Sequence, residues 1–121
     1  MRRISSKRQA RQAEAKPFRD DLIQRVGRCE YCHKKPPRVR LCVHEVANGP
    51  NRQKALDQPY AVLVLCWPCN GLATDKGTWS EAAQLKCLKE SRPEDYDLVA
   101  YCRLTNPRAL LRIEEHEVDS A

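Results

Sequence analysis

The sequence predicts a small α+β domain in which two short strands lie between helices. Residues 39–43 alternate apolar and polar side chains and residues 60–65 are continuously apolar, two patterns that indicate strands. Apolar residues at helical spacing occur before and after these stretches. Two Cys-x-x-Cys pairs bracket the strands and comprise Cys29, Cys32, Cys66 and Cys69. A chain of 121 residues with one Phe and two Trp has little bulk for a core, so such cysteines are well placed to staple it.

The cysteine pairs are a specific signal for a metal ion. Each pair directs two thiolates at one point, and four thiolates in a tetrahedron suit Zn²⁺. A closed shell of four cysteines leaves no open coordination position, so we expect them to hold a structural zinc ion. The competing interpretations are a disulfide framework and buried thiols. A thioredoxin-like redox role would need a βαβ context, which neither flank supplies.

Nothing in the sequence predicts secretion or a membrane span. The chain begins Met-Arg-Arg without an apolar signal-peptide core, and no apolar run approaches the roughly 18 residues of a span. We therefore expect a reducing, intracellular compartment, the cytoplasm, where Cys-x-x-Cys pairs favour metal over disulfide. The cysteines outside the pairs are expected to be small core residues: Cys42, Cys87 and Cys102.

The positive charge is concentrated at the N-terminus. The net charge is +6, and residues 1–20 hold seven basic and two acidic residues, so the remaining chain is nearly neutral. We expect residues 1–17 to form a basic, flexible arm or a helix that forms on a partner. The arm is either a solvated tail or a phosphate-binding segment. Its candidate phosphate ligands are Arg2, Arg3, Lys7, Arg8 and Arg11.

The elements that follow the arm are predicted in order. Pro17 closes the arm, and apolar residues at helical spacing predict a short helix over residues 19–26. After the first strand, residues 47–59 are rich in Asn, Gly, Pro, Gln and Lys and predict a long loop. A helix is expected to follow the second strand, beginning after Cys69 and stopping near residue 76.

The C-terminal third is predicted to be helical. Helical spacing predicts one helix over residues 81–89. A capping box over residues 91–94, with Pro inside the first turn, predicts a second helix that runs to about residue 104. A third helix is expected from Pro107. The apolar stripes of these helices are better suited to a core or a partner surface than to a cofactor site.

Taken together, residues 28–79 resemble the HNH (ββα-metal) endonuclease family, in the subgroup where two Cys-x-x-Cys pairs brace the hairpin with zinc. The resemblance rests on the four cysteines, the Leu-x-Val-x-x-Val pattern of residues 41–46, and the run Leu-Val-Leu-Cys-Trp-Pro-Cys-Asn that ends at Asn70. It covers somewhat under half of the chain. It implies a small zinc-stabilised ββα-metal core, HNH-like or treble-clef-like, over residues 18–79, with a helical extension over residues 80–121 packing on or beside it.

The resemblance also implies a catalytic site. In the family, the first strand ends in a pair whose first member binds a divalent ion and whose second member is the general base, and the corresponding residues here are His44 and Glu45. A ligand follows the last cysteine and a second often lies one helical turn later, at positions that correspond to Asn70 and Thr74, with Asp75 adjacent. The resemblance therefore implies Mg²⁺ or Mn²⁺ near His44 and Asn70, and hydrolysis of DNA phosphodiester bonds with Glu45 as the base.

DNA is the nucleic acid that the resemblance implies, and RNA is the alternative. Cationic side chains near the expected hairpin would join the arm in holding phosphates, because phosphate contacts position a protein on nucleic acid. These residues are Arg38, Arg40, Arg52 and Lys54.

Departures from the family pattern leave other hypotheses open. Glu45 is a weaker base than an imidazole because its ordinary pKa is about 4.3. Ala61 stands where the family has an Asn that orients the base, and Thr74 is a weak metal ligand. The second hypothesis is a catalytically inactive, zinc-binding HNH-like module that binds nucleic acid or a protein partner, with His44 merely hydrogen-bonded at the end of a strand. A third is a structural adaptor that binds through its helical C-terminal half.

Overall fold

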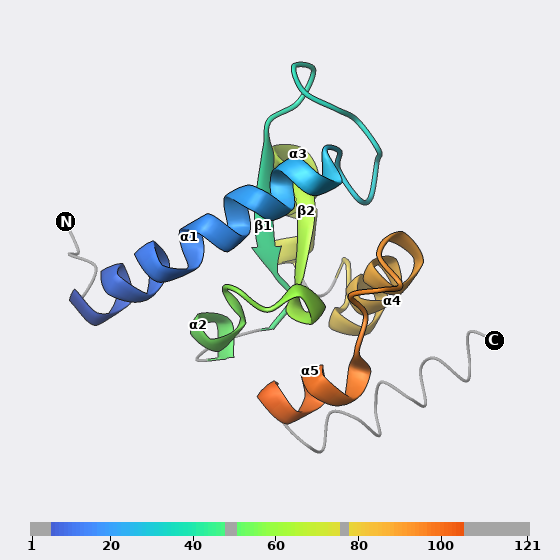
Figure 1. Cartoon of the computed structure of the whole chain (residues 1–121). Coiled ribbons are helices and arrows are strands. Elements are labelled where there is room, and N and C mark those ends of the chain that lie inside the picture. The colour runs from blue at the N-terminus through green and yellow to red at the C-terminus, as the bar shows by residue number, and fades with distance from the viewer. Residues whose placement is uncertain (1–5, 48–50, 76–77, 106–121) are drawn as a thin grey trace.

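The structure is a computed structural model in which the described residues are 6–47, 51–75 and 78–105. They form a two-stranded antiparallel sheet, five α-helices and a short 3-10 helix (Figure 1). The α+β class expected from the sequence is therefore confirmed. The third C-terminal helix, expected from Pro107, and the basic residues Arg2 and Arg3 lie outside the described residues. None of the five helices within those ranges combines the length and the apolar character that a bilayer span requires.

The sheet consists of β1 (Leu41–Glu45) and β2 (Val62–Cys66), which pair antiparallel over their full length. Both strands form in the predicted stretches, and each begins two residues later than expected. Pro59 explains the late start of β2, because its fixed φ favours the 3-10 turn η1 (Pro59–Ala61) that precedes the strand. Every residue of β2 is buried, which accounts for the continuous apolar run in its sequence.

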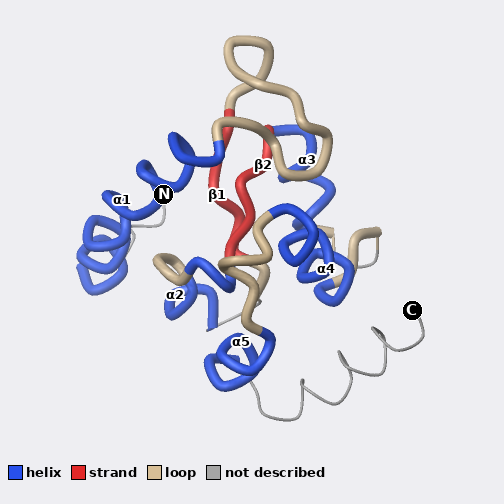
Figure 2. Tube along the Cα trace, turned by 45° about the vertical axis from the view of Figure 1, so that its right-hand side comes forward, coloured by secondary structure: helices blue, strands red, loops and turns tan. Residues whose placement is uncertain are grey.

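Helices cover both faces of the sheet (Figure 2). Helix α1 (Ser6–Val26) packs on one face, where a small apolar cluster is formed by Leu22, Val43, Val62 and Val64. Helices α3 (Trp67–Thr74) and α4 (Glu81–Ser91) lie on the opposite face. Helix α5 (Leu98–Thr105) packs against η1. The larger cluster on the side of α3 and α4 includes Leu63, Leu65, Leu85, Leu88 and Tyr101.

Helix α1 differs from the prediction, which ended a basic arm at Pro17 and began a short helix just after it. The helix instead runs without interruption over Ser6–Val26, with Pro17 inside it. Its N-terminal half is held by Arg11, which donates to the Gln53 carbonyl (2.9 Å) and forms an ion pair with Asp57 (2.7 Å). Gln53 is 42 residues away along the chain, so no local pattern could have shown this contact.

Two further helices also differ from the prediction. Helix α2 (Asn51–Ala55) forms inside the stretch predicted as a long loop, and Ala55 is fully buried in the larger cluster. Helix α3 begins at Trp67 rather than after Cys69, with Pro68 in its first turn, where the fixed φ of proline suits a helix. The early start places Cys69, one of the four predicted metal ligands, within the first turn of α3.

The predicted capping box over residues 91–94 is wrong. Ser91 is the last residue of α4, and its hydroxyl donates to the Glu30 carboxylate (2.6 Å) instead of capping a new helix. Helix α5 begins only at Leu98, and its cap is Asp97, whose Oδ1 accepts the N–H of Ala100 (3.0 Å). A long-range partner for Ser91 thus overrides the local motif.

Both edges of the sheet are hydrogen-bonded by groups from other elements. On the outer edge of β1, Arg19 of α1 donates to the Val43 carbonyl (2.7 Å). On the outer edge of β2, Glu30 takes the place of a third strand. Its N–H donates to the Val64 carbonyl (2.8 Å), and its carboxylate accepts the Val64 N–H (2.8 Å). These bonds satisfy buried backbone groups that a two-stranded sheet would otherwise leave without partners.

Candidate metal centre

The four cysteines of the two pairs converge on one point. Their Sγ atoms all lie within 4.8 Å of one another, and the Sγ atoms of Cys32 and Cys66 are 3.7 Å apart. A Zn–S bond of about 2.3 Å in a tetrahedron separates neighbouring sulfurs by about 3.8 Å, so the spacing suits a single zinc ion. All four are free thiols. The structure therefore supports the predicted site: a closed set of four thiols that could hold a metal ion, with the donors that zinc prefers.

The first pair is positioned by a tight loop after α1. Gly27, at φ 69°, ends the helix, and the N–H of Cys29 donates to the Lys34 carbonyl (2.9 Å). The N–H of His33 returns to the Cys29 carbonyl (2.9 Å), and that of Cys32 points at the Cys29 Sγ (3.5 Å). The loop thus folds back on itself and presents both sulfurs on one side.

The second pair is positioned by the junction between β2 and α3. Cys66 is the last residue of β2 and also the N-cap of α3, and Cys69 is in the first turn of that helix. Thiolates at a helix N-terminus are stabilised by the exposed N–H groups and by the helix dipole. A strand-to-helix junction therefore supplies both the geometry and part of the electrostatics of the site.

The ionisation of the thiols shows why a cation belongs among them. Burial opposes ionisation of Cys29, but hydrogen bonds from backbone N–H groups, led by that of Cys32, lower its pKa to about 7. Burial raises the pKa of Cys66 and, further, that of Cys69, where the neighbouring sulfurs add to the effect. Four thiolates cannot coexist here without positive charge. A divalent cation supplies it and would release protons as it binds.

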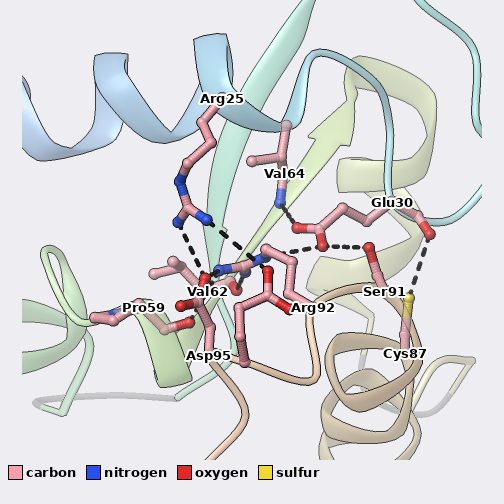
Figure 3. Close-up of polar contacts among 10 residues, drawn as sticks. Arg25, Glu30, Pro59, Val62, Val64, Cys87, Ser91, Arg92 and Asp95 are labelled. Atoms are coloured by element: carbon pink, nitrogen blue, oxygen red, sulfur yellow. Dashed lines mark hydrogen bonds and ion pairs between the residues drawn. The ribbon is translucent and has the colours of Figure 1, made fainter.

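A buried ion pair connects the loop that carries Cys29 and Cys32 to the C-terminal helices (Figure 3). Glu30, the residue after Cys29, has a fully buried side chain that accepts from Arg92 Nε (2.9 Å) and from Ser91. Arg92 also donates to the carbonyls of Pro59 and Val62. The network thus joins the loop that carries Cys29 and Cys32, the outer edge of β2 and the end of α4. Sequence reasoning missed it, because the two charged residues are 62 positions apart.

Asp95 extends this network to α1. It accepts hydrogen bonds from Arg92 Nη1 (2.8 Å) and from Arg25 Nη2 (3.0 Å). Burial alone would raise the pKa of Asp95, but the two guanidinium groups hold it below its ordinary value. The carboxylate therefore stays charged between Arg25 of α1 and Arg92, which directly follows α4.

His44 is buried on the side of the sheet that faces α3 and α4. Its Nε2 lies 2.9 Å from Oε1 of Gln84, which is fully buried. The Gln84 amide nitrogen donates to the carbonyls of Ala73 (2.9 Å) and Trp79 (2.8 Å), so its oxygen is the acceptor and His44 Nε2 carries the proton. Gln84 was not predicted as a site residue. The available hint was a polar residue one helical turn before Leu88, on a face that the apolar spacing predicts to be buried.

Glu45 lies on the other face of the sheet. Its carboxylate is 3.4 Å from Arg19 Nη2 and 3.8 Å from Arg52 Nη2. Side chains of consecutive strand residues point to opposite faces, so His44 and Glu45 diverge. The structure does not bring the expected metal ligand and the expected base to one point.

The remaining predicted ligands lie on or just after α3. Asn70 is half-buried, while Thr74 is exposed and donates to the Gly71 carbonyl (2.8 Å). Asp75 accepts from the Thr78 hydroxyl (2.9 Å). Within the described ranges, the four cysteines are the only cluster of three or more His, Cys, Asp or Glu side chains with metal-binding spacing.

The predicted phosphate ligands fall into two regions. Lys7 and Arg8 of α1 line a hollow together with Lys54, beside the ion-paired Arg11. Arg52 lies near Glu45. The second region is the loop over residues 28–40, which we call the cysteine loop. Its exposed basic side chains are Arg28, Lys34, Lys35, Arg38 and Arg40. Of these five, only Arg38 and Arg40 were predicted from the sequence to hold phosphates.

Comparison with known proteins adds no identification. No protein family, curated protein or solved structure that was compared matches this chain. The fold and the site define the chain as a small α+β protein with a candidate four-cysteine metal centre. The likeness to HNH endonucleases rests on the sequence motifs alone.

Proposed function

We propose that this protein is a zinc-stabilised, HNH-like module that binds nucleic acid without cutting it. The observation that carries the proposal is the charge of the cysteine loop, residues 28–40. Its five exposed basic side chains form no ion pair with any described acidic residue. The one acidic residue of the loop, Glu30, is buried and neutralised by Arg92. Uncompensated cations gathered on one loop favour a polyanionic partner.

The shape of the loop supports the same partner. A hollow of about 450 Å³ is lined by Cys32, His33, Lys34, Lys35, Pro36, Pro37 and Arg38, without a carboxylate. The cysteine cluster fixes one end of this segment, so a bound metal ion would hold the basic side chains in place before a ligand arrives. Fixed cations cost less conformational entropy on binding than those on a free tail.

The geometry around His44 favours binding over hydrolysis. Metal-assisted hydrolysis needs an ion and a base within reach of one water molecule. His44 is buried against Gln84, whereas Glu45 is paired with arginines on the other face of the sheet. Residues in these positions support a structural role for both side chains.

A salt titration of binding tests the proposal. Zinc-loaded protein should bind fluorescein-labelled DNA or RNA with an affinity that falls steeply with salt. The double variant Lys35→Ala/Arg38→Ala should reduce the slope of log affinity against log salt by about 2, roughly one unit for each lost cation. The matched control, Lys89→Ala/Arg103→Ala, removes one exposed Lys and one exposed Arg from α4 and α5 and should leave the slope unchanged. Salt-independent binding, no binding, or an equal effect of both variants would contradict the proposal.

The second candidate function is the endonuclease, with Mg²⁺ or Mn²⁺ near His44 and Asn70. One observation favours it: His44 is on the side of the sheet that packs against α3, the helix that carries Asn70. Supercoiled plasmid should distinguish the two functions, with Mg²⁺, Mn²⁺ or EDTA and with retained zinc measured. We expect no nicking. Metal-dependent nicking that disappears in Glu45→Gln, with zinc content unchanged, would refute the non-cutting binding module and support the endonuclease.

A further inference from the structure

Each Cys-x-x-Cys pair carries one exposed aromatic ring. Tyr31 lies within the first pair and is 52% exposed, and Trp67 lies within the second and is 57% exposed. All seven aromatic residues of the chain are described, and the other five are partly or fully buried. About half of each of these two side chains faces solvent, so the rings are available for a ligand.

Both rings are held in place by the fold. The cysteines that follow Tyr31 and precede Trp67 have sulfurs only 3.7 Å apart, so the two rings flank the same metal centre. Tyr31 packs on Trp79 with ring centroids 4.7 Å apart and an interplanar angle of 46°. The backbone N–H of Trp67 donates to the Arg40 carbonyl (3.2 Å), and the Arg40 guanidinium lies 5.9 Å from the Trp67 ring centroid. Rings fixed in this way lose little conformational freedom when a ligand binds.

Each ring also borders a hollow that contains cations. Trp67 lines a hollow of about 580 Å³ together with Arg40, which forms no ion pair with a described acidic residue. The two carboxylates of this hollow, Asp20 and Glu45, are paired with Lys16 and Arg19. Tyr31 lines one of about 540 Å³ together with Arg28 and Lys86, and its carboxylates are Glu90 and the Arg92-paired Glu30. An aromatic face beside a cation matches the two parts of a nucleotide, a flat base and a phosphate.

Single strands use such a surface better than duplexes do. Bases in a duplex are already stacked on one another and offer phosphates but no free faces to a protein ring. Single-stranded nucleic acid presents base faces, and its binders combine basic surfaces with aromatic platforms. We infer that this protein binds single-stranded nucleic acid, with bases stacking on Trp67 and Tyr31 and phosphates held by the basic side chains of the cysteine loop. The inference rests on the proposed function and specifies its ligand.

Affinity measurements with one aromatic variant test the inference. Labelled single-stranded DNA, the same sequence as a duplex, and the corresponding RNA strand are titrated at one salt concentration. Wild-type protein should bind single strands more tightly than the duplex. Trp67→Ala should weaken single-strand binding by about 5-fold to 100-fold and change duplex binding by less than about twofold. The control Leu72→Ala removes another exposed apolar side chain from α3 and should change neither affinity.

A second variant distinguishes loss of the aromatic ring from misfolding. Trp67→Tyr keeps a stacking ring and should retain most of the single-strand affinity, with the zinc content of every variant measured. In Trp79→Phe, Trp67 is the sole tryptophan, and its fluorescence should be quenched by single strands and much less by duplex. This readout reports stacking directly and does not depend on affinity.

The outcomes separate the two proposals. If the protein binds duplex with normal salt dependence while Trp67→Ala has no effect on single strands, this inference is wrong and the proposed function stands. Equal losses for single strand and duplex in Trp67→Ala also refute stacking. If wild-type protein binds neither form at low salt, the proposed function fails, and the inference fails with it.

Discussion

Removing the Arg92 side chain should destabilise this protein more than removing any exposed charged side chain does. The side chains of Arg92 and Glu30 are 4% and 0% exposed, so Arg92→Met leaves a carboxylate buried beside an apolar chain. The carboxylate keeps its bonds from the Val64 N–H and Ser91, but the carbonyls of Pro59 and Val62 lose their donor. Breaking one side of a buried pair costs about 3–5 kcal/mol, a large part of the 5–15 kcal/mol that typically stabilises a domain.

Urea denaturation of zinc-loaded protein at pH 7 measures this cost. The matched control is Lys16→Met, which breaks an exposed pair with Asp20 and should cost less than about 0.5 kcal/mol. Glu30→Gln keeps the shape and one acceptor and should cost about 1–2 kcal/mol. Because the two residues interact directly, the double variant Glu30→Gln/Arg92→Met should cost less than the sum of the single changes. A loss below about 1 kcal/mol in Arg92→Met, or one no larger than in Lys16→Met, would refute the argument that this network holds the C-terminal helices to the cysteine loop.

Three other predictions follow from the site and its supports. Stripping the metal with a strong chelator, or changing Cys69→Ser, should lower the urea midpoint, and an unchanged midpoint would show that the cluster is not structural. Zinc added back to the stripped wild-type protein should release protons as it binds, and Cys69→Ser should release fewer. Asp57→Asn should destabilise the protein at pH 7. The Arg11 partner lowers the pKa of Asp57 from its ordinary 3.8, so this stability is present above that value and lost as pH falls through the lower folded-state pKa. The difference from wild type should therefore shrink by pH 2, and a constant difference would contradict the ion-pair explanation. Gln84→Met removes the hydrogen bonds of Gln84 with His44 Nε2 and with the carbonyls of Ala73 and Trp79, and it should cost about 2–4 kcal/mol, measured against the exposed change Lys86→Met.

Local patterns predicted both strands and helix α4 because these elements depend on short-range spacing. The apolar run before Cys66 and the helical spacing after Ser80 are confirmed as β2 and α4. Local patterns failed where a distant partner decided the outcome. Pro17 was predicted to separate the basic arm from a short helix. Contacts of Arg11 with Gln53 and Asp57 instead hold the preceding turns in the same helix.

The candidate site also has a part that local spacing predicted and a part that depends on distant contacts. The spacing of the two Cys-x-x-Cys pairs correctly grouped the cysteines, whereas the resemblance paired His44 with Glu45 as if they shared one site. Their neighbours in space are Gln84 for the first and two arginines for the second. Strand alternation sends consecutive side chains apart, and which face each meets depends on helices elsewhere in the chain.

The sequence by itself determined the chemistry of the metal centre. Two Cys-x-x-Cys pairs specify four soft donors, and each pair spans only four residues, so each half of the site is encoded locally. Only the tertiary structure decided that Glu30 and Arg92 pair, that Gln84 holds His44, and that the aromatic residue of each cysteine pair faces solvent. Burial and partner choice depend on segments 40 to 62 residues apart, and no short pattern records which of them will meet.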